Sequence, residues 1–143
     1  MAHEDMLKNV PIFSELGRRD LSRLSKLMVP RSFKAGEVII KENDQAAGFF
    51  VVTSGKVEVL RGAGGPSPHL LATFGPGEFF GEMALFEGYP RSATVRALED
   101  TECLAMTRWD FTAELRTHPE IAVGMLPPLV RRLRDADARL AAE

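Results

Sequence analysis

Short apolar runs, separated by glycine, asparagine and aspartate, fill the middle of the chain. Lys56 to Leu60 alternates polar and apolar side chains, which is typical of a strand with one buried face. Gly48 to Thr53 is aromatic and β-branched, and it ends at a turn formed by Ser54 and Gly55. Because such runs recur about every eight to twelve residues from 31 to 108, the pattern predicts an all-β sandwich or barrel.

The other expected strands follow from the same pattern. They lie within 37–42, 69–74, 92–98 and 101–107, with turns at Ala35-Gly36, Asn43-Asp44, Gly75-Pro76-Gly77 and Glu99-Asp100 and an exposed loop at 62–68. Cys103 falls in the last of these strands and is expected to be a small buried apolar side chain. Because the chain has one cysteine, an internal disulfide and a cysteine-only metal cluster are excluded.

Residues 1–30 have helical periodicity. The apolar spacing from Met6 to Val10 predicts a short amphipathic helix, which Pro11 stops. A second helix is expected from Arg18, and Pro30 is expected to end it. The apolar stripe of this second helix consists of Leu21, Leu24, Leu27 and Met28.

Residues 109–143 are again helical in pattern. Trp109 to Thr117 is expected to form one helix, and Pro119 marks the start of another. Two prolines interrupt this last helix at 127 and 128. Either the helix kinks there, with Gly124 relieving the clash, or a new helix starts with the prolines in its first turn. The apolar positions approach an a/d heptad spacing and comprise Leu126, Leu129, Val130, Leu133, Ala136 and Leu140.

Composition narrows the class of protein. A chain of 143 residues, 45% apolar and 27% charged, has the size and composition of one soluble globular domain. Its net charge of -2 gives no basic surface of the kind that binds nucleic acid. The sequence contains no apolar run of about 18 residues and no signal-peptide pattern. We therefore expect a cytoplasmic protein without membrane contact.

The stretch from Phe79 to Val95 carries the candidate chemistry. It consists of Gly81, Glu82, the apolar run Met83–Phe86, a tight turn at 87–90, Arg91 and Ser92. The apolar run is too short for an ordinary helix and predicts a single helical turn, whose first N–H groups form an anion site. Arg91 adds a planar charged fork that suits a phosphate, and Ser92 adds a hydroxyl donor. Because Glu82 can accept a hydrogen bond from a sugar hydroxyl, the stretch predicts a nucleotide site.

This stretch closely resembles the phosphate-binding cassette of cyclic nucleotide-binding domains, which occur in catabolite activator proteins, regulatory subunits of cyclic-AMP-dependent kinase and nucleotide-gated channels. The matching positions are Phe80, Gly81, Glu82, Met83, Ala84, Leu85, Arg91, Ser92, Ala93, Thr94 and Val95. The resemblance covers nearly the whole chain. It implies a single domain of residues 1–143, mainly β with flanking helices at 1–30 and 109–143. A β-roll of jelly-roll type (a double-stranded β-helix) would occupy 31–108 and carry the cassette at 79–95.

The resemblance also implies a role for each part of the cassette. Arg91 would pair with the cyclic phosphate, helped by Ser92 and by the backbone amide of Ala93. Glu82 would accept a hydrogen bond from the ribose 2′-hydroxyl. The backbone of three further residues would line the pocket, namely Gly81, Met83 and Ala84.

The purine end of the site is set by fewer features. By resemblance, Val59 and Leu71 would pack on the base or ribose from the roll, and Leu133 from the last helix. Arg131 or Arg134 would stack on the base or bond to it, unless these arginines form a solvated helix face. Some family members use the cassette serine to bind guanine, and bacterial-type cyclic AMP binders also carry a serine at this position. Both nucleotides therefore remain open, and cyclic AMP is favoured.

An enzymatic function is not expected. Jelly rolls also house metal-dependent cupins, which need clustered ligands, whereas His3, His69 and His118 are scattered. A haem or iron–sulfur sensor would need more than His69 and Cys103 offer. No Ser-His-Asp order or paired-carboxylate site is present. We therefore expect no cofactor or metal, and cyclic AMP or cyclic GMP as the ligand.

The output of such a sensor is not specified by the sequence. In activator proteins a helix-turn-helix follows the long helix, whereas this sequence ends after that helix, so we expect no direct DNA binding. The chain is either a stand-alone regulatory subunit or part of a larger regulator or channel. Ligand would bridge the cassette and the last helix and favour one helix position. The alternative is a ligand-free dimerisation module, a homodimer held by Leu126, Leu129, Leu133 and Leu140.

Overall fold

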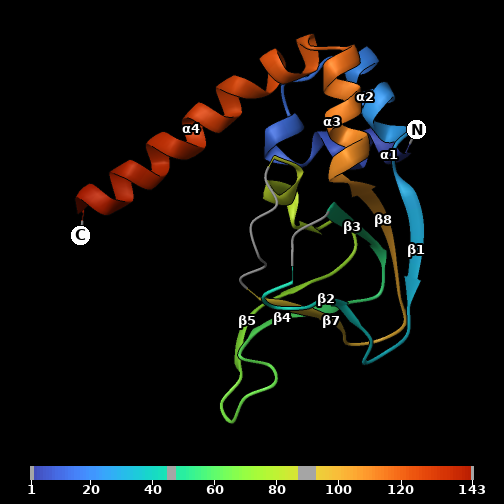
Figure 1. The fold of residues 1–143 in the computed structure, drawn as a ribbon, viewed down its shortest axis with the longest axis vertical. Helices are drawn as coiled ribbons and strands as arrows, with labels where there is room; N and C mark the ends of the chain where they lie inside the picture. The colour runs from blue at the N-terminus through green and yellow to red at the C-terminus, as the bar shows by residue number, and fades with distance from the viewer. Residues whose placement is uncertain (1, 45–47, 87–92, 143) are drawn as a thin grey trace. The chain divides into compact units, whose positions relative to one another are not determined.

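The computed structural model describes residues 2–44, 48–86 and 93–142 (Figure 1). The chain divides into two compact units. Met28–Thr112 form the first, which holds the strands and is called the strand unit below. Met1–Leu27 and Ala113–Glu143 together form the second, which is helical and is called the helical unit.

Two antiparallel sheets make up the described part of the strand unit. One sheet has the strand order β1-β8-β3-β6, built from β1 (Val29–Phe33), β8 (Thr101–Thr107), β3 (Gly48–Ser54) and β6 (Phe79–Phe80). The other has the order β2-β7-β4-β5, built from β2 (Val38–Ile40), β7 (Thr94–Ala97), β4 (Val57–Arg61) and β5 (His69–Phe74). The strands predicted from the spacing of the apolar runs are confirmed.

One buried apolar cluster is built from both sheets. Its members are Phe33, Val52, Phe80 and Cys103 from the first sheet and Ile40, Val57, Val95 and Ala97 from the second. Removing this apolar surface from water, at about 25 cal/mol per Å², holds the sheets face to face. Cys103 is 2% exposed, so the prediction of a small buried apolar side chain is confirmed.

A bulge interrupts the pairing of β4 with β5. Val59 is the partner of Ala72, whereas Leu60 is the partner of Leu70, so Leu71 is the extra residue. A bulge re-aims the side chains around it. As a result the simple alternation predicted for this strand ends at Leu60, which is buried beside the half-buried Val59.

The helical unit begins with α1 (Ala2–Lys8), η1 (Pro11–Phe13) and α2 (Arg18–Ser25). The prediction that Pro30 ends the second helix is wrong. The Ser25 hydroxyl donates to the Ser22 carbonyl at 2.8 Å, a bond that competes with the helical ladder, and α2 ends at this residue. Pro30 lies instead in β1, an edge strand, where a residue without an N–H is tolerated.

Two helices follow the last strand, α3 (Arg108–Thr117) and α4 (Glu120–Ala142), as Figure 1 shows. Both prolines at 127 and 128 lie inside α4, so the alternative of a new helix starting at them is wrong. A Cβ on Gly124 would lie 2.7 Å from Leu16 Cδ2, so the glycine makes room for that side chain. Among the described residues, no helix combines the length and the apolarity needed to cross a bilayer.

Candidate functional site

The turn that carries Glu82 follows directly from β6. Phe80 stacks on Phe50 and on Phe74, with ring centroids 5.2 Å and 6.3 Å apart, and so fixes the end of this short strand. Gly81 then adopts the left-handed conformation with φ 82°, which glycine adopts without steric cost. The chain enters η2 (Glu82–Leu85), a single turn of 3-10 helix. The predicted helical turn at this position is confirmed.

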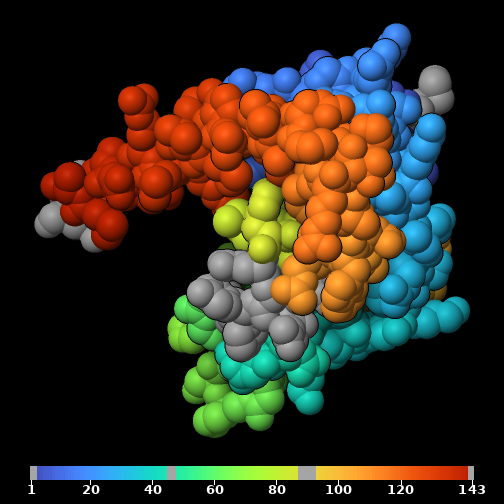
Figure 2. All heavy atoms as spheres, turned by 45° about the horizontal axis from the view of Figure 1, so that its top comes forward, coloured from blue at the N-terminus to red at the C-terminus, as the bar shows by residue number. Residues whose placement is uncertain are grey.

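The turn has a buried side and an exposed side. Ala84 and Leu85 are 5% and 1% exposed, whereas Met83 is 42% exposed. The Ala84 N–H donates to the Gly81 carbonyl at 3.0 Å, so this amide already has a partner within the turn. Glu82 is half-buried at the start of η2. The turn reaches the molecular surface, where its atoms are yellow in Figure 2.

The other end of the predicted cassette lies on the second sheet. Ala93 is half-buried and leads into β7, whose first residue, Thr94, is 6% exposed. Val95 of β7 is the partner of Val59 in β4. The structure therefore places Val59 beside the strand that begins at the cassette. Leu71, the bulge residue of β5, is 48% exposed.

Arg91 and Ser92 lie outside the described residues, so their predicted contacts stay predictions. The described residues on either side of them are Phe86, which follows η2, and Ala93. Glu82 follows a strand of the first sheet, and Ala93 precedes a strand of the second. The two described ends of the predicted cassette therefore lie next to different sheets.

Leu133 and Arg134 belong to a different unit from the cassette. Both are exposed on α4, with Leu133 63% exposed, and their contact with a base stays a prediction. Arg131 forms an ion pair with Glu15 inside the helical unit. Arg131 is therefore already engaged in an ion pair, whereas for Arg134 the structure shows an exposed position on α4.

A contact that the sequence analysis missed joins the turn to α3. The rings of Phe86 and Phe111 meet edge to face, with centroids 5.6 Å apart and an interplanar angle of 87°. Phe86 follows η2 directly and is 37% exposed, whereas Phe111 is fully buried. The aromatic residue at the end of the turn is the one feature of the sequence that indicates a ring contact there. The sequence does not show which buried ring it meets.

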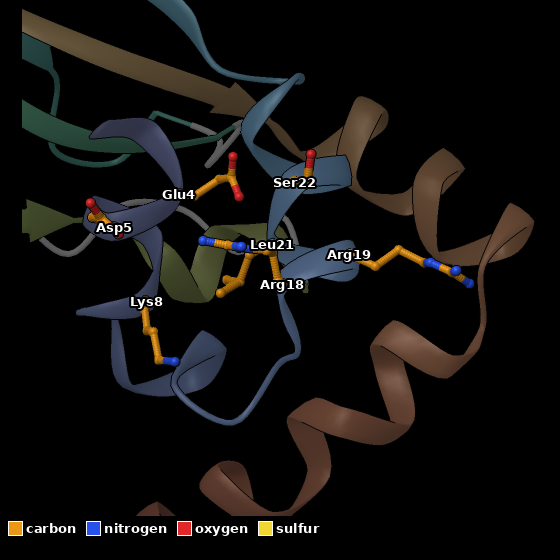
Figure 3. A pocket seen from close by; sticks show the side chains of 7 residues that line it. All are labelled: Glu4, Asp5, Lys8, Arg18, Arg19, Leu21 and Ser22. Atoms are coloured by element: carbon orange, nitrogen blue, oxygen red, sulfur yellow. The ribbon is translucent and has the colours of Figure 1, made fainter. Parts of the chain in front are cut away.

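Neither of two cavities in the described part of the chain is lined by a predicted site residue. The larger, about 780 Å³, is in the helical unit and is lined by Glu4, Asp5 and Lys8 of α1 and by Arg18, Arg19, Leu21 and Ser22 of α2 (Figure 3). The smaller, about 300 Å³, is in the strand unit and is lined by Ser32, Phe33, Lys34, Ser54, Asp100, Thr101 and Glu102. Figure 3 shows that Arg19 points away from α1, so the lining is open and of mixed charge rather than a focused anion site.

Comparison with known proteins identifies the relatives of this chain. Residues 30–118 match the family model described as the cyclic nucleotide-binding domain. Over 134 residues the chain is 37% identical to the cyclic AMP receptor protein of Thermus thermophilus, covering 94% of this chain and 62% of that protein. It is 36% identical over 113 residues to a cyclic nucleotide-gated potassium channel of Rhizobium etli, covering 79% of this chain and 30% of the channel. The chain thus spans less than two thirds of these curated relatives.

A solved structure also shares the fold. The N-terminal domain of a transcriptional regulator from Streptomyces coelicolor A3(2) superposes with a TM-score of 0.85 at 33% identity, covering 94% of this chain and 96% of that one. The predicted β-roll with flanking helices is confirmed by this similarity.

Proposed function

This chain belongs to the family of cyclic nucleotide-binding domains, and we propose that it binds a 3′,5′-cyclic nucleotide as a regulatory sensor. The observation that carries the proposal is the η2 turn, entered through the left-handed Gly81 and placed so that half-buried Glu82 opens the predicted cassette. Cyclic AMP is proposed over cyclic GMP, in keeping with the cyclic AMP receptor protein that is 37% identical to this chain over 134 residues.

The proposed contacts divide the ligand among the cassette and the roll. Glu82 accepts a hydrogen bond from the ribose 2′-hydroxyl, and Arg91 pairs with the phosphate. Ser92 and the amide of Ala93 donate to the same phosphate. Val59, which lies beside the start of β7, packs on the base or ribose. Leu71 is proposed to join this contact, and Leu133 and Arg134 of α4 are proposed to cover the base.

The proposed regulation is a shift in the position of the C-terminal helix. The edge-to-face contact of Phe86 with Phe111 supports a first step of this regulation, because it joins the end of the turn to α3, the helix that precedes α4 in the chain. A ligand that holds the turn in one conformation would favour one placement of the C-terminal helix. It moves the equilibrium only by the difference between its affinities for the two placements.

The remaining parts of the proposal concern what the domain does not do. We propose binding without chemistry, in the cytoplasm, with no direct contact to nucleic acid. The relatives named above are a receptor protein and a gated channel, which supports a regulatory rather than a catalytic role. We propose that the output partner is set by the longer protein in which such a domain occurs.

Isothermal titration calorimetry tests the proposal. The chain is titrated with cyclic AMP, with cyclic GMP and with 5′-AMP, which lacks the ring-closed phosphate. We expect saturable binding of cyclic AMP and weaker binding of the other two.

Arg91→Ala should weaken the binding free energy by roughly 3–5 kcal/mol, because it removes the partner of a buried phosphate. Arg31→Ala, at an exposed arginine of β1, is the matched control. Absence of binding to either cyclic nucleotide at saturating concentration contradicts the proposal.

A second candidate function is dimerisation, favoured by an exposed apolar stripe on α4. Its members are Val123, Leu126, Val130, Leu133 and Leu140, which are 64%, 55%, 51%, 63% and 69% exposed. Their spacing places the two valines at a positions and the three leucines at d positions of a heptad, and Asp137 holds the a position between Leu133 and Leu140. This combination favours a parallel two-stranded coiled coil. Leu129, which the predicted dimer contact also included, is half-buried. Such a homodimer is compatible with nucleotide binding. Dimerisation is the sole function of the domain only if the site binds no ligand.

A further inference from the structure

Glu42, two residues beyond the end of β2, bonds to the first residue of one strand and to the residue just after another. It follows β2 in sequence and is half-buried. Its backbone N–H donates to Thr94 Oγ1 at 3.0 Å. Its carboxylate Oε1 accepts the N–H of Gly62 at 2.8 Å. Since Thr94 opens β7 and Gly62 follows β4, one residue connects the ends of β2, β7 and β4.

The register of the sheet explains how one residue reaches both neighbours. The sheet order is β2-β7-β4-β5, so β7 lies between the other two strands. Ile40 is the partner of Val95, and Leu60 is the partner of Thr94. Glu42 therefore passes over the first residue of β7 and meets the chain just after β4.

These bonds extend the pairing of β2 with β7 beyond its last ladder pair. The register of this ladder shifts between Val38 and Ile40, and Ile40 with Val95 is the last pair. Thr94 is 6% exposed, and a buried polar group is costly to leave without its partner. Loss of the Thr94 hydroxyl would remove the acceptor of the Glu42 N–H, and the first residue of β7 would then keep its pairing with Leu60 of β4 but lose its bond to the chain after β2.

We propose that Glu42 and Thr94 are positioning residues for the nucleotide phosphate. The inference rests on the proposed function, in which Ala93 and Ser92 donate to that phosphate. Thr94 immediately follows Ala93, so its position sets where the cassette backbone meets the sheet. Fixing that point before the ligand arrives removes part of the ordering cost of binding. Neither residue touches the nucleotide in this account.

Four variants separate this role from simple support of the fold. Thr94→Val removes the hydroxyl at constant shape, and Thr94→Ser retains it. Glu42→Ala removes the acceptor for Gly62, and Glu42→Gln retains a carbonyl oxygen there. We expect Thr94→Val and Glu42→Ala each to weaken cyclic AMP binding about tenfold, and the conservative variants to restore it to within about twofold of the unchanged chain.

Urea unfolding of the nucleotide-free variants provides the second readout, and Thr53→Val provides the control. The Thr53 hydroxyl donates to the Glu102 carbonyl at 3.0 Å, a more exposed bond of the same length that involves no residue of β7. We expect Thr53→Val to lower stability without changing affinity at a temperature where all variants are folded.

Two outcomes would overturn the inference. One is unchanged affinity in both Thr94→Val and Glu42→Ala while the original chain binds cyclic AMP. The other is a loss of affinity that only follows the loss of stability, with Thr53→Val weakened to the same degree. If the original chain binds neither cyclic nucleotide, the proposed function itself fails and this inference fails with it. That result is recognised before any variant is measured.

Discussion

Phe86 at the end of the η2 turn and Phe111 of α3 are in edge-to-face contact, with ring centroids 5.6 Å apart. Both residues belong to the strand unit, so the contact is internal to that unit. It joins the turn that carries Glu82 to the first turns of the helix that follows the roll. We propose that a change in the turn reaches α3 through this contact.

Replacing Phe86 tests this route. Phe86→Ala should lose about 0.5–1.5 kcal/mol of contact energy and weaken the coupling between turn and helix. Trp109, the only tryptophan, is 62% exposed and lies two residues before Phe111, so its fluorescence reports on α3. We expect cyclic AMP to change this fluorescence in the original chain and to change it much less in Phe86→Ala. An equal response in both proteins would rule out the Phe86 contact as the route.

The role of Glu82 can be measured with a modified ligand. Glu82→Ala should cost roughly 1.5–3 kcal/mol, the contribution of a hydrogen bond to a charged group. The same loss is expected when the original chain binds 2′-deoxy cyclic AMP, which lacks the hydroxyl that Glu82 accepts from. The two losses should not add in a calorimetric double cycle. Glu87→Ala is the control and should change little. Additive losses would show that Glu82 does not meet the 2′-hydroxyl.

The strand unit was predictable from sequence to a greater degree than the ends of the helices. Alternation and turn residues locate strands such as β3 and β8 because each strand needs one buried face. The prediction at Pro30 was wrong because proline breaks a helix but is also tolerated in an edge strand. Which strand lies at the edge of a sheet is a tertiary property that the local sequence does not show. The continuous α4 through its two prolines likewise depends on packing, including the space that Gly124 leaves for Leu16.

The candidate site was predictable where a residue acts through backbone conformation. Gly81 could be assigned because a turn entered through the left-handed region favours glycine. Leu71 became the bulge residue through a register shift between two strands, which apolar alternation does not reveal. The partners of Glu42 are 20 and 52 residues away along the chain, so no local pattern indicates them.

Cys103 gives a prediction for the pH dependence of stability. Burial and the nearby Glu102 carboxylate raise the pKa of its thiol from 9.0 to about 11, against a smaller lowering by Arg31. The folded chain therefore holds this proton more tightly than the unfolded chain. The contribution to stability is complete below the ordinary thiol pKa and is lost as the pH rises from 9.0 to about 11.

Urea unfolding between neutral and alkaline pH measures this effect. The free energy of unfolding of the original chain should fall relative to Cys103→Ala by on the order of 2 kcal/mol across that interval. The native thiol should also resist iodoacetamide near pH 8. A constant difference between the two proteins, or alkylation at the rate of a free thiol, would contradict the buried protonated state.

The apolar stripe of α4 predicts self-association. Leu133→Glu places a charge at a d position and should shift the chain toward monomer in sedimentation equilibrium. Ala138→Glu adds the same charge to an exposed position outside the stripe and should have little effect. If the original chain is monomeric at the highest concentrations measured, the stripe does not act as a dimer contact. Dimers that persist unchanged in Leu133→Glu would place the contact elsewhere.

A crystal structure of the chain with cyclic AMP tests the central claim most directly. We predict electron density for the nucleotide between Glu82 and Arg91, with the carboxylate at the ribose 2′-hydroxyl and the guanidinium at the phosphate. Two observations would contradict the account. One is a nucleotide bound elsewhere, for example in the cavity between α1 and α2. The other is a pair of side chains that point away from each other, with protein atoms filling the space between them.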